Sequence, residues 1–498
     1  MALSFKKGAA RFRPSPQQQA VFDAAKALAP GQAVIVEAAA GSGKTTTIEH
    51  AVKRLGVPRQ DALVVAFSKD VERELKRRGI EAQVKTLHAL GYAALRDGPI
   101  PEAEASGGKL YRMSREKIKN PHYRWPACSL VDAARSAAVG CAGGLEDTEA
   151  NWLRLAEFYA VPTPKAGNIK GVVEQARRLL AEMVTDALTS NTIDFGDMEY
   201  LPLLLSDGPP LQRTPRYVFV DEAQDINAAQ LLLLQRFMQA DTPPSFVFVG
   251  DGAQAIYGWR GAGVNALETI EAAFEAARLP LSVSYRCPRA VVKEAAKYGD
   301  IEPAPDAPEG VCRTFPGNWR TAVEPTDAIL CRNNAPLIAE AVSLLGRGHS
   351  VNFRSKDVLS DLRFQARAVD KMASKHPDGD WRAVLSVVRD REVERNADRP
   401  MVLSRLEDVF DALDALASQA NRQGTTVDGL IDRLTDAKAG ITLSTIHRAK
   451  GLEWERVWFL RPDLIPNRFA KEPWMLQQEA NLYYVAVTRA KQALYFVE

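Results

Sequence analysis

Two short stretches of the sequence combine residue types that could bind and cleave a phosphate chain. The stretch AAAGSGKTT (38–46) follows the apolar run VIVE and brings Lys44 and Thr45 next to two glycines. The glycines let the backbone curve so that several N–H groups point at one anion, and a helix starting at the threonines would add its positive end. We therefore predict a phosphate-binding loop in which Lys44 reaches the β- and γ-phosphates and Thr45 binds Mg²⁺.

This loop departs from the usual pattern at its first position, where Ala38 replaces glycine. Alanine is acceptable there if its φ is negative. The alternative interpretation is a chance Gly-Ser turn with a solvated lysine. The residues expected to contact the nucleotide are Ala38, Ala39, Ala40, Gly41, Ser42, Gly43, Lys44, Thr45 and Thr46.

The second stretch is VFVDEAQD (218–225), in which Asp221 and Glu222 follow four apolar residues. Adjacent buried carboxylates are costly unless a cation lies among them. Mg²⁺ would be that cation: Asp221 would bind the ion and Glu222 would orient or deprotonate the attacking water. The alternative is an acidic cap for the following helix, and we expect Asp225 to be such a cap or a contact between motifs.

The bulk composition limits the classes of protein that fit. The chain has 498 residues, 46% of them hydrophobic and 25% charged, which suggests two to four globular domains. The net charge of +2 means that any nucleic-acid surface is local. Five scattered cysteines indicate reduced thiols without a zinc site or disulfides. Because we find no signal peptide and no apolar run of about 18–20 residues, we expect a cytoplasmic protein without membrane contact.

Two sets of nearly continuous apolar runs indicate the elements that position these residues. Such runs suit strands buried on both faces, so the fold class expected is α/β with parallel sheets. The first set comprises 33–46, 62–70, 83–90, 217–225 and 246–254. The second set comprises 281–286, 328–334, 441–447, 456–461 and 493–498.

Two mainly helical stretches interrupt these sets and look like insertions. Residues 91–195 contain several aromatic residues, which we expect to form the core of a helical subdomain or to extend a binding path. Residues 346–436 are charged, with apolar residues at helical spacing. The predicted boundaries are 1–90 with 196–277 for the first domain and 91–195 for its insertion, then 278–345 with 437–498 for the second domain and 346–436 for its insertion.

Taken in order, ten stretches resemble the motifs of superfamily 1 helicases of the UvrD/Rep type. The resemblance spans nearly the whole chain. It implies two RecA-like P-loop domains with ATP and Mg²⁺ between them, and 3′→5′ movement on single-stranded DNA. The stretches are SPQQQAVFDA (15–24), the phosphate loop AAAGSGKTT (38–46), AFSKDVERELKRR (66–78), TLHALGYAAL (86–95), IDFGDM (193–198), VFVDEAQD (218–225), VGDGAQAIYGWRGA (249–262), SVSYRCP (282–288), TLSTIHRAKGLEWERV (442–457) and NLYYVAVTRAK (481–491).

Two features depart from the large members of that family. The segment between SVSYRCP and TLSTIHRAKG is short, so the second insertion is reduced, and the chain stops soon after the last motif. Both features are similar to compact members, including the helicase module of the F-box DNA helicases. The reduced insertion leaves duplex engagement open.

The resemblance assigns further residues around the nucleotide. Arg286 and Arg489 resemble arginine fingers supplied by the second domain, a device that can accelerate hydrolysis by roughly 10³–10⁵. Gln254 resembles the sensor of the γ-phosphate. The nucleoside contacts implied are Gln18 and Tyr285 for adenine and Glu453 for ribose. Surface ion pairs for the arginines and structural roles for the others are the alternatives.

The resemblance also implies a track for single-stranded DNA. Tyr257 and Trp259 are two residues apart, so both rings could stack on bases from one side of an extended loop, with Arg260 on a phosphate. Two such aromatics could instead belong to a half-buried loop. The remaining track positions are Phe67, Lys69, Thr86, His88, Thr445 and His447, of which the histidines could be structural. We expect Lys450 near DNA or near the last motif.

The function expected is an ATP-dependent DNA helicase that acts on single strands and on single-strand/duplex junctions, as a monomer in isolation. One alternative is a translocase that displaces proteins from single strands and unwinds little. An alternative of another class is a non-motor, ATP-switched protein that clamps nucleic acid.

Overall fold

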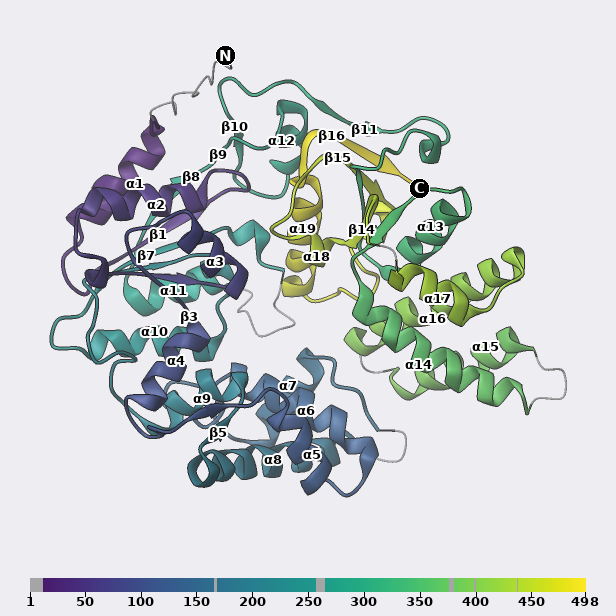
Figure 1. Cartoon of the computed structure of the whole chain (residues 1–498), viewed down its shortest axis with the longest axis horizontal. Helices are drawn as coiled ribbons and strands as arrows, with labels where there is room; N and C mark the ends of the chain where they lie inside the picture. Colours follow the sequence, from purple (N-terminus) through teal and green to yellow (C-terminus); the bar gives the residue numbers. More distant parts are fainter. Residues whose placement is uncertain (1–11, 165–167, 257–264, 376–379, 398–399, 437) are drawn as a thin grey trace, which may run out of the picture.

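The computed structural model describes residues 12–164, 168–256, 265–375, 380–397, 400–436 and 438–498. Two six-stranded parallel sheets form its two centres. Figure 1 shows the sheets side by side, with the helices of residues 91–195 beyond the first sheet and those of residues 346–436 beyond the second. The fold-class prediction, α/β with two RecA-like parallel sheets and helical insertions, is confirmed.

The first sheet has the strand order β3-β2-β6-β7-β1-β8, and its neighbouring strands are parallel. Its central strands are buried on both faces, as their continuous apolar sequences predict. The strands are β1 (Ala33–Ala38), β2 (Ala62–Ala66), β3 (Gln83–Thr86), β6 (Tyr217–Val220), β7 (Ser245–Gly250) and β8 (Ala277–Leu281).

The second sheet has the order β11-β16-β15-β12-β14-β13 and is also parallel. Its strands are β11 (Val311–Thr314), β12 (Ala328–Cys331), β13 (Val351–Phe353), β14 (Ile441–Thr445), β15 (Trp454–Leu460) and β16 (Ala490–Val497).

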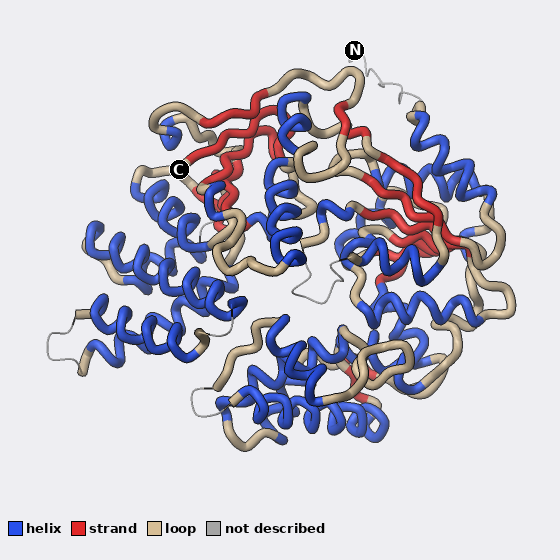
Figure 2. The backbone as a smooth tube through the Cα atoms, turned by 180° about the vertical axis from the view of Figure 1, so that it is seen from behind, coloured by secondary structure: helices blue, strands red, loops and turns tan. Residues whose placement is uncertain are grey.

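Helices lie on both faces of these strands (Figure 2). Around the first sheet they are α1 (Pro16–Ala27), α2 (Lys44–Leu55), α3 (Lys69–Arg77), α4 (Leu87–Arg96), α10 (Ala228–Gln235) and α11 (Ala266–Phe274). Around the second they are α12 (Arg289–Ala295), α13 (Asn334–Gly346), α18 (Ile446–Ala449) and α19 (Pro473–Val487).

The sequence places the run 281–286 in the second sheet, and this is wrong. Strand β8 pairs with β1 and completes the first sheet, and β9 (Val283–Ser284) pairs with β10 (Glu302–Pro303) in a separate two-stranded sheet. We therefore call residues 12–281 the N-terminal part and residues 282–498 the C-terminal part. The error arises because β8 contains an arginine and a proline, which obscure it as a strand.

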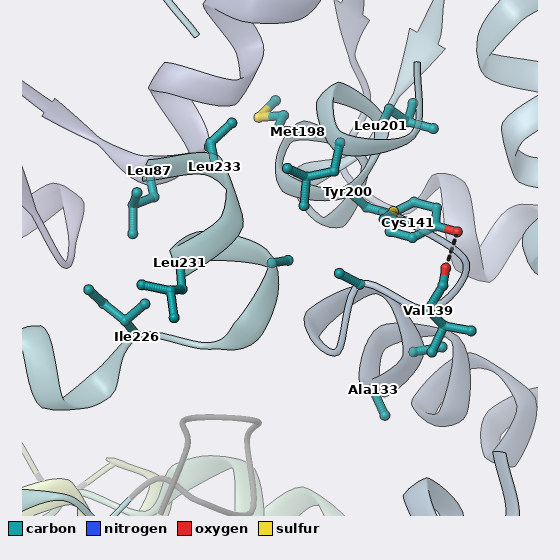
Figure 3. Close-up of a cluster of buried hydrophobic side chains, with 14 of the residues drawn as sticks. Leu87, Ala133, Val139, Cys141, Met198, Tyr200, Leu201, Ile226, Leu231 and Leu233 are labelled. Atoms are coloured by element: carbon teal, nitrogen blue, oxygen red, sulfur yellow. Dashed lines mark hydrogen bonds between the residues drawn. The ribbon is translucent and has the colours of Figure 1, made fainter. Parts of the chain in front are cut away.

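The insertion of residues 91–195 shares one hydrophobic core with the first sheet. In Figure 3, Leu87 and Leu233 face the same apolar cluster as Val139, and the Tyr200 hydroxyl donates to the Val139 carbonyl at 2.8 Å. Trp152 is buried as predicted, but Tyr111 and Trp125 are exposed. The elements are β4 (Glu104–Ala105), α5 (Lys109–Lys117), α6 (Pro121–Ser136), α7 (Glu149–Phe158), α8 (Ile169–Ser190), β5 (Thr192–Ile193) and α9 (Phe195–Leu205).

Residues 346–436 form mostly helices, as predicted, although β13 at their start belongs to the second sheet. Phe410, Leu413 and Leu416 are buried at helical spacing and share a core with Phe353 and Leu443 of the sheet. The helices are α14 (Lys356–Ala373), α15 (Trp381–Arg395), α16 (Pro400–Gln423) and α17 (Val427–Asp436). None of the helices in the described ranges is long and apolar enough to cross a membrane.

Candidate nucleotide and DNA site

The predicted phosphate loop connects β1 to α2. Gly41 and Gly43 have φ of 74° and 84°, in the left-handed region that favours glycine, whereas Ala38 ends β1 without a positive φ. A β-carbon added at Gly41 would lie 2.5 Å from the β-carbon of Arg286. The loop therefore has the curvature that an anion cradle requires, and the C-terminal part packs directly against it.

Two polar groups of this loop fit a bound phosphate. Within the described residues, the Lys44 ammonium and the Ser42 hydroxyl are buried without a hydrogen-bond partner. The Lys44 Nζ lies 3.8 Å from Glu222 Oε2, which is an ion pair without a hydrogen bond. Because a buried ammonium without a hydrogen bond is costly, the donor set at this loop suits an anionic oxygen.

The pKa values of the two adjacent carboxylates, Asp221 and Glu222, are shifted in opposite directions. Burial, followed by the neighbouring Glu222 charge, raises the pKa of Asp221 to about 7. Burial also acts to raise the pKa of Glu222, but Lys44 and Lys450 outweigh it and lower that pKa to about 2. Glu222 is therefore ionised at neutral pH, the state in which it can orient or deprotonate an attacking water.

Glu222 also has a strained backbone. Its φ is 53°, which non-glycine residues rarely adopt. Its N–H donates to Asp221 Oδ1 at 3.0 Å, which locks the turn between the two carboxylates. Such a conformation costs about 1–3 kcal/mol and is typical of functional sites, because the surrounding structure must hold it.

Arg489 is buried, with 1% of its surface exposed, and it contacts both parts of the chain. Its Nη2 donates to Gln254 Oε1 at 3.1 Å. Its other donors bind the carbonyls of Val485 and Leu452. Burial and Arg286 lower the pKa of Arg489 to about 10, so it remains charged at neutral pH.

Arg286 lies at the phosphate loop but points to Glu453. Its Nε donates to Glu453 Oε2 at 2.6 Å, and its Nη1 to the Thr488 carbonyl at 3.3 Å. Lys491 Nζ lies 2.7 Å from the other oxygen of Glu453. Glu453, assigned to ribose by the resemblance, thus holds two cations in this structure.

The residues assigned to adenine lie beside the phosphate loop. Tyr285 is 53% exposed and its N–H donates to the Gly41 carbonyl at 2.9 Å, so its ring is available for stacking. Gln18 is buried: its Oε1 accepts from the Ser15 N–H at 3.0 Å and its Nε2 donates to Thr47 at 3.3 Å. The Gln18 amide would have to exchange these partners to bind a base.

The predicted DNA track falls on both parts. Phe67 is 40% exposed, and it lines a cavity of about 300 Å³ together with His88. His88 Nδ1 lies 3.1 Å from Glu199 Oε1. Lys69 pairs with Glu72 at 2.8 Å, while Thr86 caps α4. Thr445 is buried at the end of β14, and His447 follows half-buried in α18. Tyr257, Trp259 and Arg260 lie outside the described residues.

Two family models match this chain. Residues 17–110 and 159–275 match the UvrD/REP helicase N-terminal domain, and residues 406–498 match the UvrD-like helicase C-terminal domain. The chain belongs to the UvrD/Rep helicase family.

Similar proteins cover most of the chain. F-box DNA helicase protein 1 of Schizosaccharomyces pombe is 26% identical over 94% of this chain and 56% of that protein, so the chain spans little more than half of it. ATP-dependent DNA helicase UvrD2 of Mycobacterium tuberculosis is 26% identical over 93% of the chain and 76% of UvrD2. ATP-dependent DNA helicase PcrA of Staphylococcus aureus is 21% identical over 93% and 80%. The prediction of an ATP-hydrolysing enzyme of the helicase class is confirmed.

Sequence reasoning missed one residue that bridges the UvrD-like motifs of the N-terminal part. Gln224 Nε2 donates to Glu222 Oε2 at 2.5 Å, and its Oε1 accepts from the Asp251 N–H at 2.9 Å. Asp251 Oδ2 in turn accepts from Gln254 Nε2 at 2.5 Å. An amide side chain among acids was the available signal, because it can donate to one group and accept from another.

Lys450 also has a definite place. Its ammonium donates to both carboxylate oxygens of Asp225, at 2.7 and 2.6 Å, and to the Gln254 carbonyl at 2.8 Å. Asp225 is therefore a contact between motifs, and Asn227 caps α10 instead. Lys450 was expected near DNA or the last motif; in this structure it binds Asp225 of the acidic motif (218–225) and the stretch around Gln254, here called the glutamine motif.

Asp221 and Thr45, the residues predicted to bind Mg²⁺, suit an ion that takes its other ligands from phosphate and water. Asp221 is buried, and in the described part of the chain no cation pairs with it; Thr45 lies in the first turn of α2. No cluster of three or more His, Cys, Asp or Glu side chains that could hold a metal occurs among the described residues. Such a set suits Mg²⁺, which is commonly bound by one or two protein ligands, phosphates and water.

Proposed function

We propose that this chain is an ATP-dependent DNA helicase or translocase that moves 3′→5′ on single-stranded DNA. The observation that carries the proposal is that two sets of groups meet around the phosphate loop and the acidic motif. Lys44 and Glu222 come from the N-terminal part, whereas Arg286 and Arg489 come from the C-terminal part. Hydrolysis that needs both sets is coupled to the movement of one part against the other.

In the proposed reaction the chain's own side chains bind, orient and stabilise. Lys44 and the loop N–H groups bind the phosphates, and Glu222 orients the attacking water. Arg286 leaves Glu453 and joins Arg489 against the charge that develops on the γ-phosphate. Mg²⁺, held by Thr45 and Asp221, would neutralise charge on the phosphate oxygens.

The contacts between motifs support coupling of this reaction to DNA. Lys450 joins Asp225 to Gln254 across the two parts. Asp225 lines the same cavity as Gln230 and His88. Gln230, at the start of α10, donates to Glu199 at 2.9 Å, and Glu199 contacts His88. A displacement at the acidic motif can therefore reach the proposed track through packed polar neighbours.

The domain division supports the same proposal. We propose that residues 1–90 with 196–277 and residues 278–345 with 437–498 form the two motor domains, and that β8 extends the first of them to Leu281. Residues 91–195 and 346–436 are then the insertions. We further propose single-strand/duplex junctions as the substrate, with the chain acting as a monomer.

The deciding experiment measures ATP hydrolysis with and without single-stranded DNA, followed by unwinding of 3′-tailed and 5′-tailed duplexes. We expect DNA-stimulated hydrolysis and unwinding of the 3′-tailed duplex. A rate that single-stranded DNA does not change would instead favour the non-motor ATP-switched clamp. Preference for the 5′ tail would reverse the polarity without affecting the motor assignment.

A second candidate is a translocase that displaces bound proteins and unwinds little. The structural observation in its favour is that α14–α17 pack on the core of the second sheet. An insertion held in this way has less freedom to grip duplex DNA. A forked-duplex assay beside a protein-displacement assay separates the two, and brisk unwinding by the monomer would exclude this candidate.

A further inference from the structure

Helix α19 contacts the N-terminal part through two polar side chains to which no role has been assigned. Asn481 Nδ2 donates to the carbonyls of Gly252 and Ala255, at 3.1 and 2.9 Å. The Tyr484 hydroxyl accepts from the Ala40 N–H of the phosphate loop at 3.1 Å. Both side chains are at least 97% buried and lie three residues apart, on one face of the helix. This face therefore binds the phosphate loop and the glutamine motif together.

The same helix end carries Arg489. The Thr488 hydroxyl donates to the Tyr484 carbonyl at 2.9 Å, and Arg489 Nη2 donates to that hydroxyl at 2.9 Å. A short chain of hydrogen bonds thus links the residue that binds the phosphate loop to the guanidinium that binds Gln254. The position of α19 on the N-terminal part sets the position of the guanidinium.

We propose that Asn481 and Tyr484 are positioning residues that dock α19 and bring Arg489 into register with the phosphate loop. This inference rests on the proposed ATPase. Their hydrogen bonds cross from one part of the chain to the other, so they form only when the parts are closed. When the parts separate, water can bind the Ala40 N–H and the two carbonyls, and the phosphate loop keeps its own fold.

The test compares two tyrosines that are neighbours on α19. Tyr484→Phe keeps the ring, which packs against Gly299, and removes the acceptor of the Ala40 N–H. A buried donor left unpaired in the closed state disfavours closure, and we expect kcat for DNA-stimulated hydrolysis to fall roughly five- to thirtyfold. Binding of fluorescent ADP should change less than about twofold, because the loop binds ADP without the arginines.

Tyr483→Phe is the matched control. The Tyr483 hydroxyl lies 3.4 Å from Glu294 Oε1, and its ring packs against Tyr298 and Phe459, all within the C-terminal part. Its kcat should stay near that of the wild type. Asn481→Leu provides an independent variant: it leaves two carbonyls without a donor and should lower kcat with the same small change in ADP affinity.

The outcomes separate this inference from the proposed function. A wild-type chain without DNA-stimulated hydrolysis would overturn the proposed function. If the wild type is active and Tyr484→Phe hydrolyses ATP as fast as Tyr483→Phe, the docking inference is wrong and the function stands. A Tyr484→Phe variant that loses ADP binding as strongly as kcat would also overturn it, since the hydroxyl would then maintain the loop itself.

Discussion

The N-terminal and C-terminal sides of the nucleotide site differ in whether their cationic side chains already have hydrogen-bond partners. On the N-terminal side, the Lys44 ammonium has no hydrogen-bond partner in the described structure. On the C-terminal side, Arg286 is paired with Glu453, and Arg489 is enclosed by protein acceptors. The N-terminal side can therefore bind an anion without breaking a hydrogen bond of Lys44. On the C-terminal side, an arginine must either give up its present partner to bind the nucleotide or move together with the residues that hold it.

The two arginines differ from each other in the same respect. The Arg286–Glu453 pair is partly exposed, with 19% and 38% of the side chains accessible, and such pairs contribute at most about 1 kcal/mol. Arg286 can therefore turn from Glu453 to a phosphate at low cost. Arg489 is buried and its guanidinium makes four hydrogen bonds to protein acceptors, so it must move together with α19.

The largest effect is expected at Lys44. Lys44→Ala removes a buried ammonium that has no hydrogen-bond partner among the described residues and is expected to bind phosphate, so nucleotide turnover should be lost. Steady-state hydrolysis measures it, and Lys53→Ala, at an exposed position of the same helix, is the control. Turnover retained in Lys44→Ala would refute the phosphate-loop assignment and with it the comparison of the two sides.

Glu222→Gln should have the next largest effect. Glutamine keeps the shape and the hydrogen bonds but not the charge that orients water, so hydrolysis should fall by roughly 10²–10⁴. Filter binding of labelled ATP should be retained, because Lys44 is intact. A mild loss of hydrolysis would mean that another group orients the water.

Substitution of the two arginines tests their difference directly. Both Arg286→Ala and Arg489→Ala should lower kcat strongly, by up to roughly 10³. Only Arg489→Ala should also lower the melting temperature by a few degrees, since it leaves buried acceptors unpaired. Thermal unfolding checks this, and equal melting temperatures would show that Arg489 is as loosely held as Arg286.

The sequence predicts the N-terminal side better than the C-terminal side. The loop at 38–46 and the acids at 221–222 are contiguous patterns whose chemistry follows from local spacing. The partners of Lys450 and Tyr484 are more than 190 residues away, and only the packing of two sheets brings them together. The strands follow the same rule: continuous apolar runs were found, whereas β11 (VCRT) and β13 (VNF) are too short and too polar to recognise.

An intermediate effect is expected on the DNA track. Trp259→Ala should weaken single-strand binding by roughly 1–3 kcal/mol, the contribution of one stacked base, and leave basal hydrolysis unchanged. Fluorescence anisotropy with an oligonucleotide measures the binding. Trp125→Ala, at an exposed tryptophan of α6, is the control. Loss of the folded state in Trp259→Ala would instead indicate that this ring is part of the core.

The smallest effect is expected at Glu453, and its sign is informative. Burial acts to raise the pKa of Glu453, but Lys491 and Arg286 lower it overall, so the carboxylate is charged at neutral pH and competes with phosphate for Arg286. Glu453→Gln should therefore lower KM for ATP a few-fold while kcat changes little. If Glu453 binds ribose instead, the same variant raises KM for ATP. Glu453 then does not compete with phosphate for Arg286. The direction of the change in KM thus decides whether the C-terminal side exchanges partners during the cycle.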